Sequence, residues 1–411
     1  MTTTTRYAPA SNTGSLDLPE LGIERRWTMS NDFPQADIPE ILRLLERAYN
    51  GGPLWYALPV EPADHFRWKY IDSPYGSQLS TMVDRDGHII DFVGVSLFPW
   101  LVRGQTHIGS DGGDMARDPA WQGRKLSTVL QEHRGLGRHP DIEFLLGYIT
   151  HPINAHVVAA MGWVHLANPV QTLERPFGLQ PLLPPRLRRR SSPVVSDVKG
   201  ESSTALALRD AQLTTRDRFT NLARGYLRYA RSVLGRRPAR GASDITVTTI
   251  DRFDPSYEPF LAAAQAPFEF IRERTLDYLN WRYCDPRAGS FTVRVAREGD
   301  EILGYTATRI DGNTARLADM LVVPNREDVL DALFDDAVRF AQRHGVSWLQ
   351  TRLTKKHPYR RAAARAGFVV EREDAGAMLD SYIEDGNDVT KDVLLDPNAR
   401  LHITYGDSDH M

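Results

Sequence analysis

The chain has 411 residues, 41% of them hydrophobic and 25% charged, with a formal net charge of -3. This length exceeds one typical core, so we expect two or three domains of a soluble globular protein, and the charge argues against whole-surface binding of nucleic acid. A single cysteine, Cys284, excludes an internal disulfide and fits a reducing cytoplasm, and no apolar run approaches the roughly 20 residues of a membrane span.

The first half of the chain predicts an alternation of strands and helices. Residues 1–20 lack the apolar core of a signal peptide, and we expect them to form a disordered tail. The hydrophobic periods and turn signals then predict a strand at 23–29, helices at 34–50 and 62–70, and two strands hinged at 84–88. A strand ending at 114–117 follows, and then a helix from about 123 to 133 and a buried strand at 142–150. A short helix at 154–162 and a strand at 163–174 close the copy. This plan indicates an α/β class with a mixed sheet.

The second half repeats the first. The stretch "WKYIDSPYGS" at 68–77 returns as "WRYCDPRAGS" at 281–290, with Lys69 mirrored by Arg282. "DMARDP" at 114–119 returns as "DMLVVP" at 319–324, and "HPINAHVVAAMGW" at 151–163 returns as "HPYRRAAARAGF" at 357–368. Three echoes in the same order indicate a duplicated domain. We expect domains at 21–176 and 244–411.

Residues 177–243 are expected to connect the two copies. They include the Pro- and Arg-rich "LQPLLPPRLRRRSSPVV" at 179–195, which is typical of a linker. Residues 216–240 then combine apolar residues at helical spacing with eight arginines. One interpretation is a helix that packs between the domains, and the other is a basic face for an anionic partner such as an acyl-carrier protein, RNA or a lipid surface.

The turn after the strand that ends at Arg117 favours an anion. In "DPAWQGRKLSTVL" a helix begins near Gly123, and the first amides of a helix point outward beside the positive end of its dipole. A small residue lets a pyrophosphate approach those amides. Ser127 adds a hydroxyl donor, and Arg124 and Lys125 add positive charge.

The first copy resembles the GNAT superfamily of acyl-CoA-dependent acyltransferases. The resemblance is carried by "DPAWQGRKLSTVL", "IEFLLGY" and "NAHVVAAMGW", and the second copy resembles the same fold. It implies two tandem GNAT-like domains and acetyl-CoA or another acyl-CoA as co-substrate, with no metal. The residues that it implies for cofactor binding are Met115, Ala116, Arg117, Gln122, Gly123, Arg124, Lys125, Leu126, Ser127 and Asn154. Lys125 departs from the family, which usually has a second glycine there, and Asn154 has a helix cap as its alternative role.

The second copy differs at the corresponding turn. Its "VPNREDVLDALFDD" has no glycine after Pro324, and Glu327, Asp328 and Asp331 would repel a phosphate. We expect this copy to have lost cofactor binding.

The resemblance implies acyl transfer from the CoA thioester to an amine, which needs a base for the amine and an acid for the thiolate. Asp114 is a candidate base, with Asp111 second, but Asp319 stands at the same place in the copy expected to be inactive, which favours a role in the fold. The usual tyrosine acid is absent from "NAHVVAAMGW", so Tyr148 and His151 are candidate substitutes. The echo of His151 at His357 again favours a structural role.

These patterns predict a cytoplasmic N-acyltransferase, most simply an acetyltransferase, that acts on a small-molecule amine. We expect "GGPLWYALPVEP" at 51–62, with Trp55 and Tyr56, to form a wall of the acceptor site or to pack on its own domain. Two alternatives remain: an aminoacyl transferase of tandem GNAT fold that uses aminoacyl-tRNA, and a non-catalytic scaffold. The sequence indicates neither the acceptor, the acyl length nor the oligomeric state.

Overall fold

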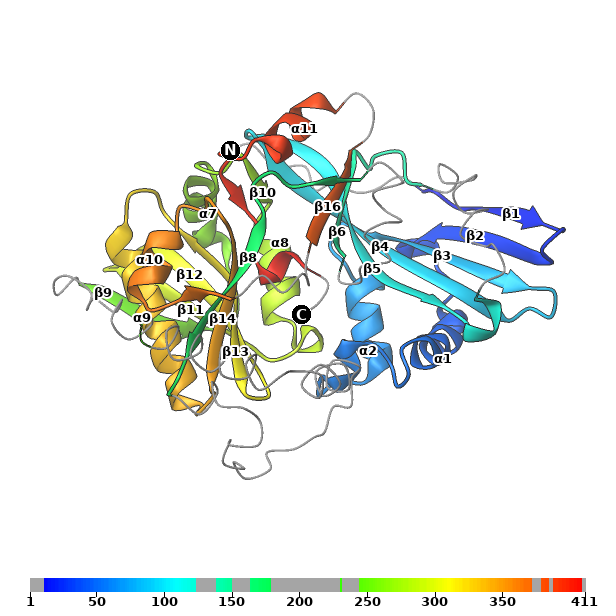
Figure 1. Cartoon of the computed structure of the whole chain (residues 1–411), viewed down its shortest axis with the longest axis horizontal. Helices are drawn as coiled ribbons and strands as arrows, with labels where there is room; N and C mark the ends of the chain where they lie inside the picture. Colours follow the sequence, from blue (N-terminus) through cyan, green and yellow to red (C-terminus); the bar gives the residue numbers. More distant parts are fainter. Residues whose placement is uncertain are drawn as a thin grey trace, which may run out of the picture.

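The computed structural model describes residues 11–122, 138–149, 163–178, 230, 244–371, 378–383 and 387–408. The predicted basic helix and nearly all of the predicted linker lie outside these residues. Figure 1 shows the first half of the chain on the right and the second half on the left, in contact along the centre.

The larger sheet is built mainly from the first half. In the described chain its order is β1 (Gly14–Leu18), β2 (Ile23–Met29), β3 (Ser77–Asp84), β4 (Ile89–Val102), β5 (Gln105–Arg117), β6 (Phe144–Ile149), β16 (Met378–Ile383) and β7 (Val164–His165). β10 (Phe270–Arg272) pairs with β4 and with β17 (Leu401–His402). All neighbours in the series from β1 to β5 are antiparallel, whereas β5 and β6 are parallel, so the sheet is mixed as expected.

Helices cover one face of this sheet because their apolar residues recur at helical spacing. In α1 (Ile38–Ala48), Ile38, Ile41, Leu44 and Leu45 are buried against strand residues that include Phe92. α2 (Pro62–Phe66) continues into a π turn, η4 (Arg67–Ile71). Short 3-10 turns occur at Ser30–Asp32, Gln35–Asp37, Leu54–Ala57 and Pro119–Trp121.

The smaller sheet carries the second half. Its order is β15 (Val369–Val370), β8 (Val170–Pro176), β14 (Trp348–Thr354), β13 (Thr314–Val322), β12 (Glu301–Asp311), β11 (Phe291–Glu298) and β9 (Ile245–Ile250). The α-helices of the described part of the second half are α7 (Glu258–Gln265), α8 (Leu276–Leu279), α9 (Glu327–Arg343), α10 (Arg360–Arg365) and α11 (Asp388–Leu395). η9 (Asn280–Cys284) is a π turn at the place in the repeat where η4 lies, and Pro255–Tyr257, Pro286–Ala288 and Tyr405–Asp407 are 3-10 turns.

The two halves exchange a strand. β8 belongs to the first copy in sequence but lies between β14 and β15, and β16 belongs to the second copy but lies between β6 and β7 (Figure 1). The expected strand at 163–174 is therefore two strands in different sheets. Because of this exchange, the expected boundary at 176 does not separate the two sheets.

The expected disordered tail is wrong in part. Gly14–Leu18 forms β1, which pairs antiparallel with β2 in register from Gly14↔Trp27 to Leu18↔Ile23. The alternation of Leu16 and Leu18 with polar residues suits a half-buried edge strand, and Leu18 is buried beside Met82 and Ile90.

The halves share one hydrophobic core. The ring of Trp100 on β4 stacks on that of Phe270 on β10 with centroids 4.7 Å apart. Trp68 and Trp281, which correspond in the repeat, stack at 4.7 Å with 15° between their planes. Trp68 Nε1 donates to the carbonyl of Trp281 at 2.8 Å, and Trp281 Nε1 donates to the carbonyl of Trp68 at 2.9 Å. The duplicated elements thus meet about a local twofold axis.

Candidate functional site

β5 and β6 pair over a short stretch and then separate. Their parallel register runs from Gly109↔Phe144 to Asp111↔Leu146, whereas the strands themselves continue to Arg117 and Ile149. Backbone groups of β5 after Asp111 therefore lose their neighbour on that side. Such an edge can bind an extended polar ligand through main-chain hydrogen bonds.

A β-bulge lies where the strands separate. Val93↔Met115 and Val95↔Gly112 are paired, so two residues of β5, Gly113 and Asp114, oppose Gly94. Glycine is required at 113 because a Cβ there would lie 2.5 Å from the Tyr70 hydroxyl oxygen and 2.8 Å from the Gly94 carbonyl oxygen. The second half has a bulge in the same place, before Asp319, where Ala318 is the extra residue. The bulge is part of the duplicated fold.

The direction of the β5 backbone decides which of its residues face the open edge. The Asp118 amide donates to the carbonyl of Ile90 at 2.8 Å, so Asp118 and, by alternation, Ala116 direct their backbone groups toward β4. Met115 and Arg117 direct theirs to the edge that β6 has left, and the Tyr49 hydroxyl donates to the Met115 carbonyl at 2.9 Å. Of the three strand residues expected at the cofactor, Met115 and Arg117 have suitable backbone geometry and Ala116 does not.

Asp114 is held in a buried ion pair. Its carboxylate accepts from Lys69 Nζ at 2.8 Å, from the Tyr70 hydroxyl at 2.9 Å and from Trp55 Nε1 at 3.1 Å. Burial alone would raise its pKa, but the Lys69 ammonium and the hydrogen bonds outweigh burial and lower the pKa. A carboxylate that is so bound is a poor proton acceptor, so the geometry favours the structural role for Asp114 over the catalytic one.

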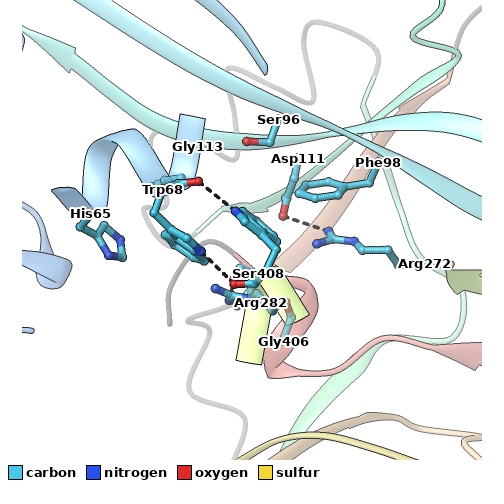
Figure 2. Close-up of a pocket in the computed structure, with 12 residues that line it drawn as sticks. His65, Trp68, Ser96, Phe98, Asp111, Gly113, Arg272, Arg282, Gly406 and Ser408 are labelled. Atoms are coloured by element: carbon cyan, nitrogen blue, oxygen red, sulfur yellow. Dashed lines mark hydrogen bonds and ion pairs between the residues drawn. The ribbon is translucent and has the colours of Figure 1, made fainter. Parts of the chain in front are cut away.

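A small pocket, with a cavity volume of about 30 Å³, lies between the halves. Figure 2 shows its lining: His65, Trp68, Lys69, Ser96, Phe98, Asp111, Gly113, Arg272, Trp281, Arg282, Gly406 and Ser408. It reaches the bulge through Gly113 and the last paired residue of β5 through Asp111. The Asp111 carboxylate accepts from Arg272 Nη2 at 3.1 Å. The pocket therefore adjoins the point at which β5 and β6 part.

His65 is neutral and has a fixed tautomer. Its Nδ1 lies 2.7 Å from the carbonyl of Arg287, so Nδ1 carries the proton and donates, and Nε2 is left as an acceptor. Burial, with the nearby Lys69 charge, lowers its pKa to about 3. The ring stacks on Trp55 at 4.8 Å. His65 thus brings no positive charge to the pocket at neutral pH.

The other residues expected from the sequence divide into two groups. Gln122 is exposed, and its amide donates to the carbonyl of Pro119 at 3.3 Å. The backbone of Tyr148 lies in β6 opposite Leu379, whereas Gly123, Arg124, Lys125, Leu126, Ser127, His151 and Asn154 lie outside the described residues. Trp55 binds Asp114 and Tyr56 donates to the carbonyl of Leu42, so both pack within their own half rather than as a wall of the pocket.

Sequence reasoning missed Tyr49, His65, Arg272 and the C-terminal residues of the pocket. Only one signal was visible, the match of Lys69 to Arg282 in the repeat. In the described residues there is no group of three His, Cys, Asp or Glu that could bind a metal ion, and no helix there is long and apolar enough to span a membrane.

The second half closes the equivalent edge with its own side chains. β13 and β14 pair from Thr314↔Trp348 to Leu317↔Thr351, and β13 then continues to Val322. The buried Tyr359 hydroxyl accepts from the Val322 amide at 3.1 Å and lies 3.3 Å from the Val322 carbonyl. Val322 corresponds to Arg117 in the repeat, so a phenol occupies this edge in the second half. Ile153, the residue that corresponds to Tyr359 in the first half, lies outside the described residues.

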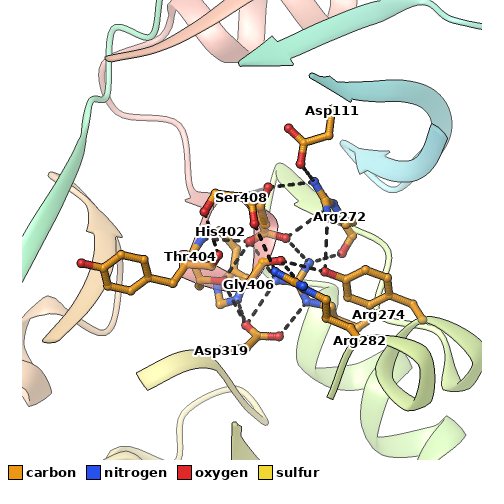
Figure 3. Close-up of polar contacts among 12 residues, drawn as sticks. Asp111, Arg272, Arg274, Arg282, Asp319, His402, Thr404, Gly406 and Ser408 are labelled. Atoms are coloured by element: carbon orange, nitrogen blue, oxygen red, sulfur yellow. Dashed lines mark hydrogen bonds and ion pairs between the residues drawn. The ribbon is translucent and has the colours of Figure 1, made fainter. Parts of the chain in front are cut away.

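Behind this edge lies a buried polar network, shown in Figure 3. Asp319 accepts from Arg274 Nε at 2.9 Å and from the Tyr305 hydroxyl at 2.6 Å, and Arg274 also binds Asp407. Burial alone would raise the pKa of Asp319, but Arg274 and His402 lower it well below its usual range. The Tyr359 amide donates to His357 Nδ1 at 3.1 Å, so His357 Nε2 carries a proton and donates to His402 Nδ1 at 3.0 Å. In the second half, the region behind the diverging strands is thus filled by this half's own side chains.

Comparison with known proteins shows the fold. No family model and no curated protein matches the sequence. The chain is similar to a protein of unknown function from Enterococcus faecalis V583, described as a probable N-acyltransferase, at 11% identity over 88% of this chain and 72% of that one, with a TM-score of 0.51. It is also similar to a tandem GNAT protein from the clavulanic acid biosynthesis pathway, at 14% identity over 88% of this chain and 98% of that one, with a TM-score of 0.50. The expected fold is confirmed: the chain has two GNAT-like units in tandem.

Proposed function

We propose that this chain, which has the tandem GNAT fold, is an acyl-CoA-dependent N-acyltransferase that transfers an acetyl group to a small-molecule amine. The observation that carries the proposal is the separation of β5 from β6 after Asp111↔Leu146, with the backbone of Met115 and Arg117 facing the open edge. The second half has the same separation, but Tyr359 fills it.

The cofactor would lie across that edge. In this proposal the pantetheine arm bonds to the backbone of Met115 and Arg117. The pyrophosphate binds the turn from Gln122 to Ser127, where the first amides of the helix predicted from the sequence and the cations Arg124 and Lys125 would favour an anion. The co-substrate supplies a thioester carbonyl, which the amine attacks as the thiolate leaves. The thiolate is a modest base and can leave without an acid, so Tyr148 and His151 remain candidates rather than requirements.

The acceptor would enter through the pocket between the halves. Gly113 and Asp111 place this pocket against the bulge, next to the open edge. Asp111 lines the pocket, whereas Asp114 is enclosed by Lys69, Tyr70 and Trp55. We therefore assign ammonium binding to Asp111 and leave proton removal to Asp111 or to solvent in the pocket.

Thermal shift with acetyl-CoA, CoA and tRNA tests the proposal, because a ligand at a hundred times its Kd stabilises the native state by about 2.7 kcal/mol. A raised melting temperature with acetyl-CoA and CoA is expected. Stabilisation by tRNA alone, lost steeply with added salt, would instead indicate an aminoacyl-tRNA-dependent transferase. If none of the three ligands raises the melting temperature, the non-catalytic scaffold is favoured instead. An amine library with a thiol-release readout then identifies acceptors.

A further inference from the structure

The charges that line the pocket are not balanced evenly. Three cations, Lys69, Arg272 and Arg282, and one carboxylate, Asp111, line it. Lys69 Nζ lies 2.8 Å from Asp114, and Arg272 Nη2 lies 3.1 Å from Asp111. These two cations therefore have carboxylate partners.

Arg282 differs from the other two. Its Nε donates to the carbonyl of Gly406 and its Nη2 to that of Ser408, both at 3.1 Å, and its guanidinium lies 5.7 Å from the centre of the Trp68 ring. Within the described parts of the chain, no carboxylate forms an ion pair with it. Carbonyls and a ring face offer only partial negative charge. Arg282 is 5% exposed, and a buried charge is costly unless an opposite charge meets it.

The duplication explains why this charge is left over. Arg282 corresponds to Lys69, and Asp319 corresponds to Asp114, the partner of Lys69. In the second half, however, Arg274 occupies Asp319 with Nε at 2.9 Å and Nη2 at 3.2 Å. Arg282 is consequently turned to the pocket without the partner that its counterpart has (Figures 2 and 3).

We infer that the acceptor is an amine that also carries a carboxylate, with the carboxylate bound by Arg282 and the ammonium by Asp111. This inference rests on the proposed function. A guanidinium matches a carboxylate in charge and geometry, and Nη1 of Arg282 is used in neither of its two carbonyl bonds. A carboxylate balances the one charge of the pocket that has no ion-pair partner among the described residues, whereas a phosphate dianion would exceed it. Phe98 and Trp281 offer apolar surface to the carbon skeleton between the two ends.

The test compares each of a panel of L-amino acids with the amino alcohol that has the same side chain. The two members differ in the carboxylate and keep the amine. With acetyl-CoA in the thiol-release assay, we expect at least one amino acid to have a kcat/KM about tenfold or more above that of its alcohol, the size of effect that one charge-assisted pair can give. Arg282→Met should remove this preference and Arg282→Lys should keep part of it.

The control variant is Arg352→Met. Arg352 lies 3.5 Å from the Ser408 hydroxyl, but Arg352 itself does not line the pocket. It should keep the preference. Should Arg282→Met not fold, the wild-type protein still decides: N-acetyl-amino acids should raise its melting temperature more than the matching N-acetyl-amino alcohols do.

Three results would overturn the inference while leaving the proposed function intact: amino alcohols that react as fast as the amino acids, a preference that persists in Arg282→Met, or binding of acetyl-CoA with no amino acid acetylated. If the protein does not bind acetyl-CoA, the proposed function itself is contradicted. The binding measurement therefore separates the two failures.

Discussion

The two halves present the same pair of diverging strands and treat it differently. In the first half, β5 leaves β6 after Asp111, and its backbone faces an edge with a pocket beside it. In the second half, β13 leaves β14 after Leu317, and Tyr359, His357 and His402 fill the space. The duplicated fold thus keeps the diverging strands in both copies, and in the second copy side chains fill the space beside them.

The equivalent aspartates of the two copies, Asp114 and Asp319, have similar structural surroundings. Asp114 and Asp319 follow equivalent bulges, are buried and bind a cation. Because the filled copy keeps this aspartate in an ion pair, its presence does not identify a catalytic centre. Among the described residues, the copies differ in the side chain that bonds to the edge: Tyr359 bonds to Val322 in the second copy, and Tyr49 bonds to Met115 in the first.

The largest expected effect on ligand affinity concerns the turn that follows the β5 edge. Gly123→Glu should lower acetyl-CoA affinity by about 100-fold or more, about 2.7 kcal/mol, since it puts a bulky negative charge where the pyrophosphate is proposed to bind. Titration calorimetry with acetyl-CoA measures it. A charge change in the corresponding turn of the other copy, Glu327→Gln, should leave affinity unchanged. Equal losses in both variants would place the cofactor elsewhere.

The largest expected effect on stability concerns the paired aspartates. Asp319→Asn should lower the free energy of unfolding by about 3–5 kcal/mol, because it leaves the Arg274 charge buried beside Asp407 alone, and Asp114→Asn should have a similar cost by stranding Lys69. Urea denaturation measures both. The Asp114→Asn variant also tests whether Asp114 acts in catalysis.

The role of Asp114 in catalysis is tested by measuring kcat per folded molecule of Asp114→Asn. If Asp114 has a structural role, Asp114→Asn should keep kcat within about tenfold of wild type, whereas loss of a general base costs about 10²–10⁴-fold. A fall in kcat of the larger size, in a variant whose acetyl-CoA affinity is unchanged, would restore Asp114 as the base.

The sequence predicted the class, the duplication and most elements of each copy, because hydrophobic periods and turn residues are local. It did not predict the exchange of β8 and β16: the pattern of Val170–Pro176 indicates a strand but not the sheet that receives it. The pocket depends on contacts such as Arg272 with Asp111, which are 161 residues apart and have no local signature. Lys69 and Arg282 were visible as equivalents, but only the position of Arg274 shows that their partners differ.

A smaller effect should follow from two buried neutral histidines, one in each half. Burial lowers the pKa of His65 to about 3 and that of His357 well below 6.5. As the pH falls below about 6.5 the unfolded chain binds a proton at each site and the folded chain does not, so stability falls by about 1.4 kcal/mol per pH unit for each histidine. Urea denaturation between pH 6.5 and pH 4.5 should show that His65→Asn and His357→Gln each reduce this slope. An unchanged slope in either variant would mean that the histidine takes up protons in the folded state.

The smallest effect concerns the contact where the copies meet. Trp68 and Trp281 each donate Nε1 to the other's carbonyl across stacked rings, so Trp68→Phe and Trp281→Phe should each cost about 1–2 kcal/mol by leaving one carbonyl without its donor. Trp68 is buried and Trp281 is only partly buried, so burial alone would make the Trp68→Phe variant the more costly one. Because the two hydrogen bonds are equivalent in the repeat, we expect the two variants to lose nearly the same free energy of unfolding. The double variant should cost less than the sum, since each ring also supports the other by stacking. Unequal costs that follow burial alone would show that packing of Trp68, rather than the reciprocal contact, joins the halves.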